Sequence, residues 1–202
     1  MKKIFTVMIC VFLFPVLTRA AETREFKNSV TAAAGFPHFF SGQYSRQVGK
    51  KTAIGLAIGQ SFVPETTKAC GAKVSMSGAN IEAVSRYHFK GKSFFGGFNA
   101  GYQDFSIESK QRSIPGSDYD IKDGVKVFYV TPHVGWFKRA GSGFTIGSEL
   151  GIRVPLSTKR YTERTGPGDY TPDVRKAVDD GMELLAKKPL PFLTLIRLGY
   201  SF

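Results

Sequence analysis

The C-terminal stretch, residues 190–202, constrains the fold of this chain more than any other part of the sequence. It reads LPFLTLIRLGYSF. Side chains alternate between the two faces of an extended strand, so the alternate positions counted back from Phe202 to Leu190 share one face. That face is almost continuously apolar, whereas the other face is mixed and carries Arg197. The pattern predicts a β-strand with one side in lipid.

Seven earlier stretches show a similar alternation. We predict strands at 26–35, 39–48, 52–62, 79–89, 94–108, 125–138 and 144–156, with 190–202 as the eighth. In the clearest of them, large apolar residues such as Leu56 and Ile58 alternate with Gly55, Ala57 and Gly59. Large residues outside and very small residues inside suit a narrow barrel, because bulky side chains from other strands then reach across the interior.

Residues 1–20 have the pattern of a secretory signal peptide. Two lysines precede an apolar run at 4–17, and Ala20 ends a suitable cleavage site. A membrane anchor is the alternative, but the run is short for a spanning helix of about 20 residues. Removing 1–20 deletes two lysines, Arg19 and no acid, so the net charge falls from +12 to +9. We therefore expect a single mature domain at 21–202.

The cysteines offer no covalent support for this exported domain. Cys10 lies inside the apolar run and is not preceded by the small residues of a lipoprotein site, so we expect no lipid anchor. Only Cys70 remains in the mature chain, which excludes an intramolecular disulfide. We expect Cys70 to be an unused loop thiol. Closure of a barrel, which pairs every backbone group, would supply the stability instead.

The connections between the predicted strands alternate between short and long. Turns at 49–51, 90–93 and 139–143 are short, and loops at 63–78, 110–123 and 157–189 are long. Outer-membrane barrels have short periplasmic turns and long extracellular loops, so both termini are expected in the periplasm. Aromatic residues cluster near strand ends, as interfacial girdles do: Phe94, Trp136, Phe144, Tyr200 and Phe202 at one end, and Phe36, Phe40 and Phe62 at the other. A soluble periplasmic lipocalin-like barrel is the alternative. The terminal Phe, the very small residues on the second face of the strands and the turn lengths favour a membrane barrel instead.

A helix is predicted at 172–188, within the last long loop. Its apolar residues recur at helical spacing: Val174, Ala177, Val178, Met182 and Leu185. Pro172 suits the first helical position, two lysines occupy the last turn, and Pro189 stops the helix. We favour a lid that packs its stripe on the barrel mouth or on other loops, because an exposed stripe is a liability. Insertion into the lumen and presentation to a partner are the alternatives.

In architecture the mature chain resembles small eight-stranded bacterial outer-membrane barrels of the OmpA/OmpX type. The resemblance rests on the strand pattern and on a general C-terminal signature at Ile196, Leu198, Tyr200 and Phe202. It implies an all-β, eight-stranded antiparallel up-and-down transmembrane barrel with one short helix in the last long loop. It also implies a monomer in the outer membrane of a Gram-negative-type cell, delivered by the barrel assembly machinery that reads such C-terminal strands. It transfers no specific activity.

The charges predicted to face inward form the main candidate site. This lumen charge network comprises Glu82, Arg86, Lys126, Glu149, Arg153 and Arg197, with Gln43, Asn99, Gln103 and His133 nearby. Charges in a narrow interior must pair or be solvated. We favour a plug of ion pairs, because an eight-stranded interior is just wide enough for side chains to fill. The alternative is a narrow pore with a mild anion preference.

The remaining chemistry-bearing residues do not indicate an enzyme. The three histidines, His38, His88 and His133, are expected at different levels of the barrel, and no serine and carboxylate accompany them at a triad spacing. The His-x-Ser arrangement of outer-membrane lipid A deacylases is absent, so a lipid A-modifying enzyme is the weakest candidate. We expect no metal and no cofactor.

The basic charge points to anionic partners. Residues such as Lys159 and Arg164 in the outer loops suit lipopolysaccharide phosphates. We expect outer-membrane lipid and lipopolysaccharide as partners, and no nucleic acid, because the chain is exported and has no nucleic-acid motif. The sequence therefore favours an outer-membrane protein with a structural or surface-interaction role.

Overall fold

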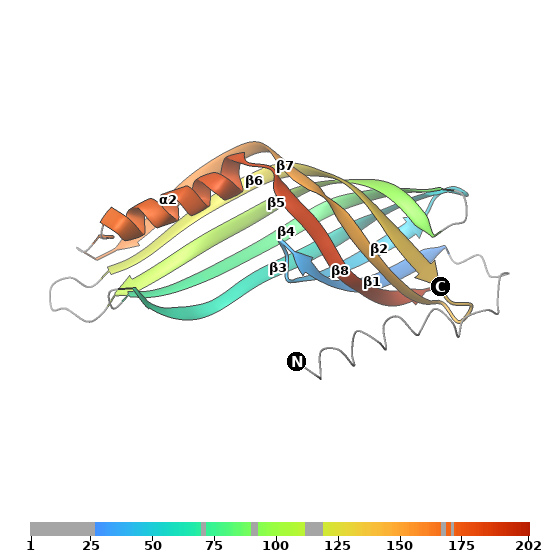
Figure 1. Cartoon of the computed structure of the whole chain (residues 1–202), viewed down its shortest axis with the longest axis horizontal. Helices are drawn as coiled ribbons and strands as arrows, with labels where there is room; N and C mark the ends of the chain where they lie inside the picture. Colours follow the sequence, from blue (N-terminus) through green and yellow to red (C-terminus); the bar gives the residue numbers. More distant parts are fainter. Residues whose placement is uncertain (1–26, 70–71, 90–92, 112–118, 167–168, 171) are drawn as a thin grey trace.

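A computed structural model describes residues 27–69, 72–89, 93–111, 119–166, 169–170 and 172–202. Eight strands form a closed ring in chain order, each antiparallel to its neighbours, with the last strand pairing with the first (Figure 1). The strands are β1 Asn28–Phe36, β2 Phe40–Gln47, β3 Thr52–Ala69, β4 Ala72–His88, β5 Phe94–Gln111, β6 Tyr119–Arg139, β7 Phe144–Thr165 and β8 Leu190–Ser201. Helix α2, Pro172–Lys187, joins β7 to β8. The predicted eight-stranded antiparallel barrel with one helix in the last connection is confirmed.

The eight strands differ in length, so the ring is closed over only part of the barrel. Strands β1, β2 and β8 have 9, 8 and 12 residues, whereas β3 to β7 have 17 to 22. The last β2–β3 pair is Phe40 with Gln60, and the last β7–β8 pair is Arg153 with Leu190. Beyond these pairs, five strands continue as a curved sheet (Figure 1). We call this the projecting end, and the end with Asn28 and Ser201 the terminal end.

The projecting strands correct the prediction of three long loops. Most of 63–78 is a β3–β4 hairpin, β6 begins at Tyr119 within the predicted loop 110–123, and β7 continues to Thr165. The sequence pattern failed because its signal was the apolar outer face, and this face becomes polar along the projecting strands while the inner face of β5 and β6 stays apolar under α2. On β4 and β5, outward apolar residues give way to Ser77 and Ser106, whose hydroxyls are 3.1 Å apart. The backbone ladder continues although the outer face is no longer apolar.

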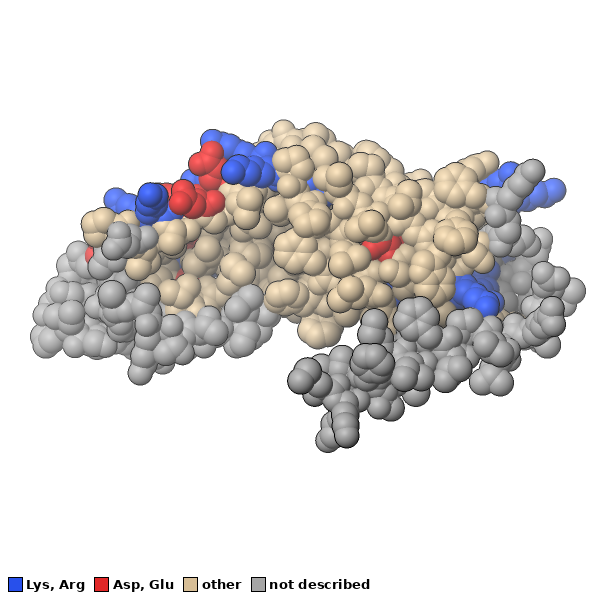
Figure 2. Space-filling view, in the orientation of Figure 1, with Lys and Arg blue, Asp and Glu red and all other residues tan. Residues whose placement is uncertain are grey.

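An exposed apolar belt surrounds the closed part of the barrel. It includes Ile54, Leu56, Ile58, Ile81, Phe98, Phe128, Val134, Leu150 and Ile152. Figure 2 shows a largely uncharged band across the visible face, with both signs of charge toward the helix and basic side chains at the opposite end. An apolar surface this extensive is too large for a soluble monomer, so the belt faces lipid. The barrel is a transmembrane barrel. Among the described residues, no helix is long and apolar enough to span a bilayer.

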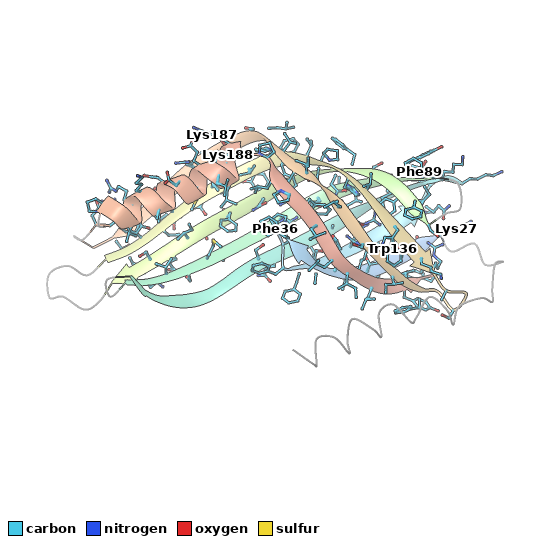
Figure 3. All side chains as sticks on the ribbon, in the orientation of Figure 1. Lys27, Phe36, Phe89, Trp136, Lys187 and Lys188 are labelled. Carbon is cyan, nitrogen blue, oxygen red and sulfur yellow. The ribbon has the colours of Figure 1, made fainter. Side chains whose placement is uncertain are left out.

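Aromatic residues mark both edges of this belt, as predicted. Trp136, Phe89 and Lys27 all lie toward the terminal end, whereas Phe36 lies near the middle of the long axis (Figure 3). Phe94, Phe144, Tyr200 and Phe202 are also exposed at the terminal end. The side chain of Phe62, which was assigned to the other girdle, lies outside the described set, as does Cys70.

A β-bulge in β8 corrects the prediction that one face persists through 190–202. Ala34 of β1 pairs with Ile196 while Gly35 pairs with Thr194, so Leu195 is the extra residue. Leu195 is 68% exposed, and the bulge turns the residues before it over, so that Leu190, Phe192 and Thr194 are buried in the interior. A bulge inserts one residue and reverses the alternation. After it, Leu198, Tyr200 and Phe202 are exposed on the outer face as predicted, and Ile196 is partly buried.

Helix α2 packs its apolar stripe on the inner face of the projecting sheet, as the lid interpretation predicted. Val178, Met182 and Ala186 are buried against a cluster from β5 and β6: Phe105, Ile121, Val125, Val127 and Tyr129. Val174 and Leu185 are partly buried against the same cluster, but Ala177 is exposed and does not belong to the stripe. Ion pairs flank this packing: Arg160 with Asp179 at 3.8 Å, and Asp169 with Arg164 at 3.1 Å and Arg175 at 2.5 Å.

Candidate functional site in the barrel interior

The interior of the closed part is filled by charged and amide side chains. Five of the six residues predicted for the lumen charge network are buried there: Glu82, Arg86, Glu149, Arg153 and Arg197. They come from β4, β7 and β8, and their guanidinium and carboxylate groups meet across the barrel axis. They form two clusters, one centred on each glutamate.

The first cluster, toward the terminal end, is centred on Glu149. Its carboxylate pairs with Arg86 through one oxygen and with Arg197 through the other, at 3.0 Å. Both guanidinium groups also donate to Gln43 Oε1, at 2.8 and 2.7 Å, and Arg197 donates to Thr31 Oγ1 at 3.0 Å. Five strands, β1, β2, β4, β7 and β8, are thereby joined through side chains.

The second cluster, toward the projecting end, is centred on Glu82. Glu82 Oε1 accepts hydrogen bonds from Arg153 at 2.7 Å, Tyr129 at 2.6 Å and Asn80 at 2.8 Å. Its other oxygen accepts from Asn99 at 2.9 Å, and Arg153 also donates to Gln103 at 2.6 Å. A carboxylate with four donors is satisfied where it lies, which is the condition for a buried charge.

His38 belongs to the second cluster, although the sequence placed it only at the first outer turn. Arg153 Nη1 donates to His38 Nε2 at 2.6 Å, so Nε2 is the acceptor nitrogen. The proton is therefore on Nδ1, which lies 3.2 Å from Ser61 Oγ, while the Ser61 hydroxyl donates to the Pro37 carbonyl at 2.6 Å. The Ser61 proton is engaged by a backbone oxygen, so the Ser61–His38 pair is not arranged as an activated nucleophile.

Tyr129 connects the lumen to the packing under α2, and sequence reasoning missed it. Its hydroxyl donates to Glu82, its ring lies 3.9 Å from the Arg153 guanidinium carbon, and the same ring belongs to the apolar cluster beneath the helix. The alternation of β6 held the signal, because Tyr129 shares the inner face with His133. His133 itself is enclosed by the rings of Phe95 and Phe192, at 5.9 and 5.8 Å.

Lys126 does not belong to this site, which corrects its assignment to the lumen. Alternation in β6 is uninterrupted here, so Lys126 shares the outer face with the exposed residue Phe128. Its ammonium lies 3.8 Å from Asp104 on β5 and 5.3 Å from the centre of the Tyr161 ring on β7. Both members of the Lys126–Asp104 pair are about 40% exposed, at 42% and 41%. The pair lies just beyond the apolar belt, toward the projecting end.

Small residues on the inner face leave room for these clusters. A Cβ added at Gly59 of β3 would lie 2.3 Å from Asn80 Oδ1 and 3.1 Å from the His38 ring. A Cβ added at Gly101 of β5 would lie 2.7 Å from the Tyr129 hydroxyl and 2.8 Å from Glu82 Cγ. This confirms the prediction that bulky side chains occupy the space beside the very small residues of β3.

Two cavities of about 20 and 30 Å³ lie within the closed part of the barrel. The smaller lies between the clusters and is lined by residues of both, including Gln43, Glu82 and Arg197. The larger is lined by residues of the terminal end, including Lys27, Arg86 and Arg139. A cavity needs at least about 10–15 Å³ to hold one water, so each has room for one or two. Within the described parts of the chain, no group of three His, Cys, Asp or Glu side chains is placed to hold a metal ion.

No family model matches the chain, and no curated protein matches it in sequence. Among solved structures, it is similar to the crystal structure of Acinetobacter baumannii CarO2, with a TM-score of 0.53 and 12% identity over 89% of this chain and 100% of that chain. Acinetobacter baumannii CarO matches with a TM-score of 0.48 and 12% identity, over 90% of this chain and 100% of that chain. At this identity the likeness to CarO2 shows the eight-stranded barrel fold, whereas the resemblance to the OmpA/OmpX type remains a prediction.

Proposed function

We propose that this protein is a closed outer-membrane β-barrel with a structural or surface-interaction role, performed by its projecting end. The observation that carries the proposal is the interior network, in which two glutamates and three arginines of the described chain are hydrogen-bonded across the barrel axis. The adjoining cavities have room for one or two waters each. A path for solutes would require these ion pairs to separate, and separated buried charges are costly.

The bacterial outer membrane is the proposed location, with both termini in the periplasm. The fold, the apolar belt, the signal-peptide pattern and the C-terminal strand support it. The short turns lie at the terminal end, as periplasmic turns do, so the projecting sheet and α2 face outward. The proposed partners are outer-membrane lipid, lipopolysaccharide and the barrel assembly machinery, and the proposed state is a monomer. Cations at the edge of the belt, such as Lys126 and Lys159, suit lipopolysaccharide phosphates.

A narrow pore with a mild anion preference is the second candidate. One observation favours it: among the described residues, the buried interior set holds three arginines against two glutamates, an excess of one positive charge. If the clusters were mobile enough to admit a continuous file of water, that excess would favour anions over cations. Removing Lys126 from the interior set reduces the excess from two charges to one.

Single-channel conductance in planar bilayers separates these two functions. The refolded mature protein is compared with a variant in which a short Gly/Ser linker replaces 172–188. Because the network lies at the level of the lipid belt and not at α2, we expect both proteins to be silent. A third variant, Glu82→Ala with Arg153→Ala, removes the second cluster and is expected to conduct intermittently if it folds.

The other outcomes are equally informative. Steady conductance of the wild-type protein would reject the closed barrel and establish the pore. Conductance of the linker variant alone would make α2 a gate, with the interior network open when the helix is absent. Heat-modifiable mobility on gels confirms for each variant that the barrel has formed before its conductance is interpreted.

A further inference from the structure

The terminal end of the barrel carries one sign of charge among the side chains that the structure describes. Its cations are Lys27, Arg46, Lys50, Lys51, Lys138 and Arg139, whereas the described Asp and Glu residues lie in the interior or toward the projecting end. Figure 2 shows basic side chains alone at this end and both signs near the helix. The charged side chains described at the projecting end are of both signs, whereas those described at the terminal end are cations, with the α-carboxylate of Phe202 nearby. We call these terminal-end cations the positive rim.

The larger interior cavity opens at this rim. Its lining residues are Lys27, Asn28, Ser29, Ser45, Gln47, Ala53, Arg86, His88, Phe137 and Arg139. Three of them are cations, and none is an acid. Lys27 precedes β1, and Arg139 ends β6 on the same inner face as the buried residue Phe137, so two exposed cations stand at the mouth of the cavity. Lys27 lies toward the terminal end of the barrel (Figure 3).

Arg86 forms the inner wall of this cavity and is almost fully buried. Its Nη2 bonds Glu149 and Gln43, but its Nε is buried and has no hydrogen-bond partner. A buried donor without an acceptor is destabilising, and more so when the group is charged. Arg86 therefore places a guanidinium with one unpartnered donor in the wall of a cavity whose mouth carries two further cations.

We propose that the terminal mouth of the barrel binds one oxyanion group, a phosphate or a carboxylate, held by Arg86, Lys27 and Arg139. The cavity has room for one or two water-sized atoms, which suits the oxygens of one such group rather than a larger solute. The α-carboxylate of Phe202 accepts a hydrogen bond from the Asn28 amide at 2.9 Å, so it lies near this end of the barrel, but Phe202 is not among the residues that line the cavity. The site does not depend on the proposed function, because either a closed barrel or a pore can have it.

Arginine side-chain NMR tests this site directly. The refolded mature protein, in uncharged detergent micelles, is titrated with inorganic phosphate and separately with acetate at constant ionic strength, while the Nε–Hε resonance of Arg86 is followed. We expect a saturable shift. Lys27→Gln and Arg139→Gln should each weaken the affinity about tenfold, the effect of losing one charge-assisted hydrogen bond.

Lys50→Gln and Lys51→Gln are the matched controls, because they remove the same charge from the same end without touching the cavity. They should leave the affinity within about twofold, as expected for exposed charges. A shift that does not saturate, or equal losses in lining and control variants, would overturn the site and reduce the effect to general screening. All four positions are exposed, so folding of the variants, checked by heat-modifiable mobility, is expected to be retained.

A second experiment, in lipid nanodiscs, identifies the source of the oxyanion. The same resonance is compared in nanodiscs of zwitterionic and of anionic phospholipid, without added phosphate. A shift in anionic nanodiscs alone, with none on adding phosphate or acetate in micelles, would assign the site to a lipid headgroup. A shift with phosphate or acetate in micelles would assign it to a free solute. Absence of any shift in both arms would contradict the proposal.

Discussion

At the scale of single residues, buried charges in this barrel depend on their partners. Glu149 lies between Arg86 and Arg197, and all three are almost fully buried. Glu149→Ala would leave two guanidinium groups facing each other without an anion. We expect the free energy of unfolding to fall by about 3–5 kcal/mol, the usual cost of an uncompensated buried charge. Urea titration of the refolded protein in micelles, followed by the fluorescence of Trp136, measures it.

Lys126 provides the control for that prediction. Its pair with Asp104, at 3.8 Å, is exposed on the outer face. Exposed pairs contribute about 0–1 kcal/mol, so Lys126→Gln should leave the urea midpoint nearly unchanged. Equal losses in Lys126→Gln and Glu149→Ala would contradict the assignment of one to the outer face and of the other to the interior.

Most of the interior charges could be predicted from the sequence, because side chains alternate between the two faces of a strand. Lys126 is two residues from Phe128, so strict alternation places both side chains on the outer face of β6. Only its charge suggested that Lys126 faces the lumen. Alternation could place Tyr129 on the inner face, but it could not show which groups Tyr129 and His38 contact. Their partners, Arg153 and Glu82, lie on distant strands, and only closure of the ring brings them within hydrogen-bond distance.

At the scale of elements, α2 is held to the projecting sheet mainly by apolar packing. Met182 is 2% exposed at the centre of the stripe, whereas Leu184 is 45% exposed. Met182→Ala should weaken docking of the helix by about 2–5 kcal/mol, and Leu184→Ala should have little effect. Trypsin cleavage at the C-terminal lysines of α2 should accelerate in the first variant alone, while both barrels keep their heat-modifiable mobility. Unchanged cleavage of Met182→Ala would mean that the ion pairs alone hold the helix.

A substitution at Gly181 should stabilise α2, whereas Met182→Ala should weaken its docking. A Cβ at this position meets no atom within 4 Å. Gly181→Ala should therefore stabilise α2 by about 1 kcal/mol through backbone entropy and helix propensity. Slower hydrogen exchange of the α2 amides would show it, and the exchange of β3 and β4 amides should not change. Faster exchange in α2 would indicate a steric conflict that this geometry does not contain.

Asp169 makes the docking of α2 dependent on pH. Its pKa is lowered below the ordinary 3.8, chiefly by the hydrogen bond from the Tyr170 amide at 2.7 Å and further by Arg175 and Arg164. Because the pKa of Asp169 is lower in the folded protein, ionised Asp169 stabilises the docked helix fully above pH 3.8. This stabilisation is lost as the pH falls through the pKa of Asp169 in the folded protein. Pepsin cleavage in the 166–172 connection should therefore rise as the pH falls below about 3.8.

The matched variant for this effect is Asp169→Asn, which cannot ionise. It should be cleaved at an elevated rate throughout, with a weaker pH dependence than the wild-type connection. If the two proteins showed the same pH profile, another group would control the docking.

At the scale of the whole molecule, the C-terminal residue is predicted to act in assembly more than in stability. Phe202 is exposed on the outer face at the terminal end. Phe202→Ser should reduce the amount of heat-modifiable barrel formed in cells, because the C-terminal signature is altered, while refolding in detergent remains possible. Phe144→Ser, at another exposed aromatic position of the same end, is the control for loss of apolar surface. Normal assembly of the Phe202 variant in cells would count against the signal interpretation.

Local sequence patterns were enough to predict the number of strands, most of the lipid-facing residues and a helix at 172–188, which the structure has at Pro172–Lys187. These features depend on local periodicity, because the bilayer imposes an apolar outer face on each strand separately. The tertiary structure decided the rest: the bulge at Leu195, the strands that continue beyond the lipid, and the pairing of Glu82 and Glu149 with their arginines. Each of these depends on contacts between strands distant in sequence, which form only when the ring closes, and no pattern within one strand reports them.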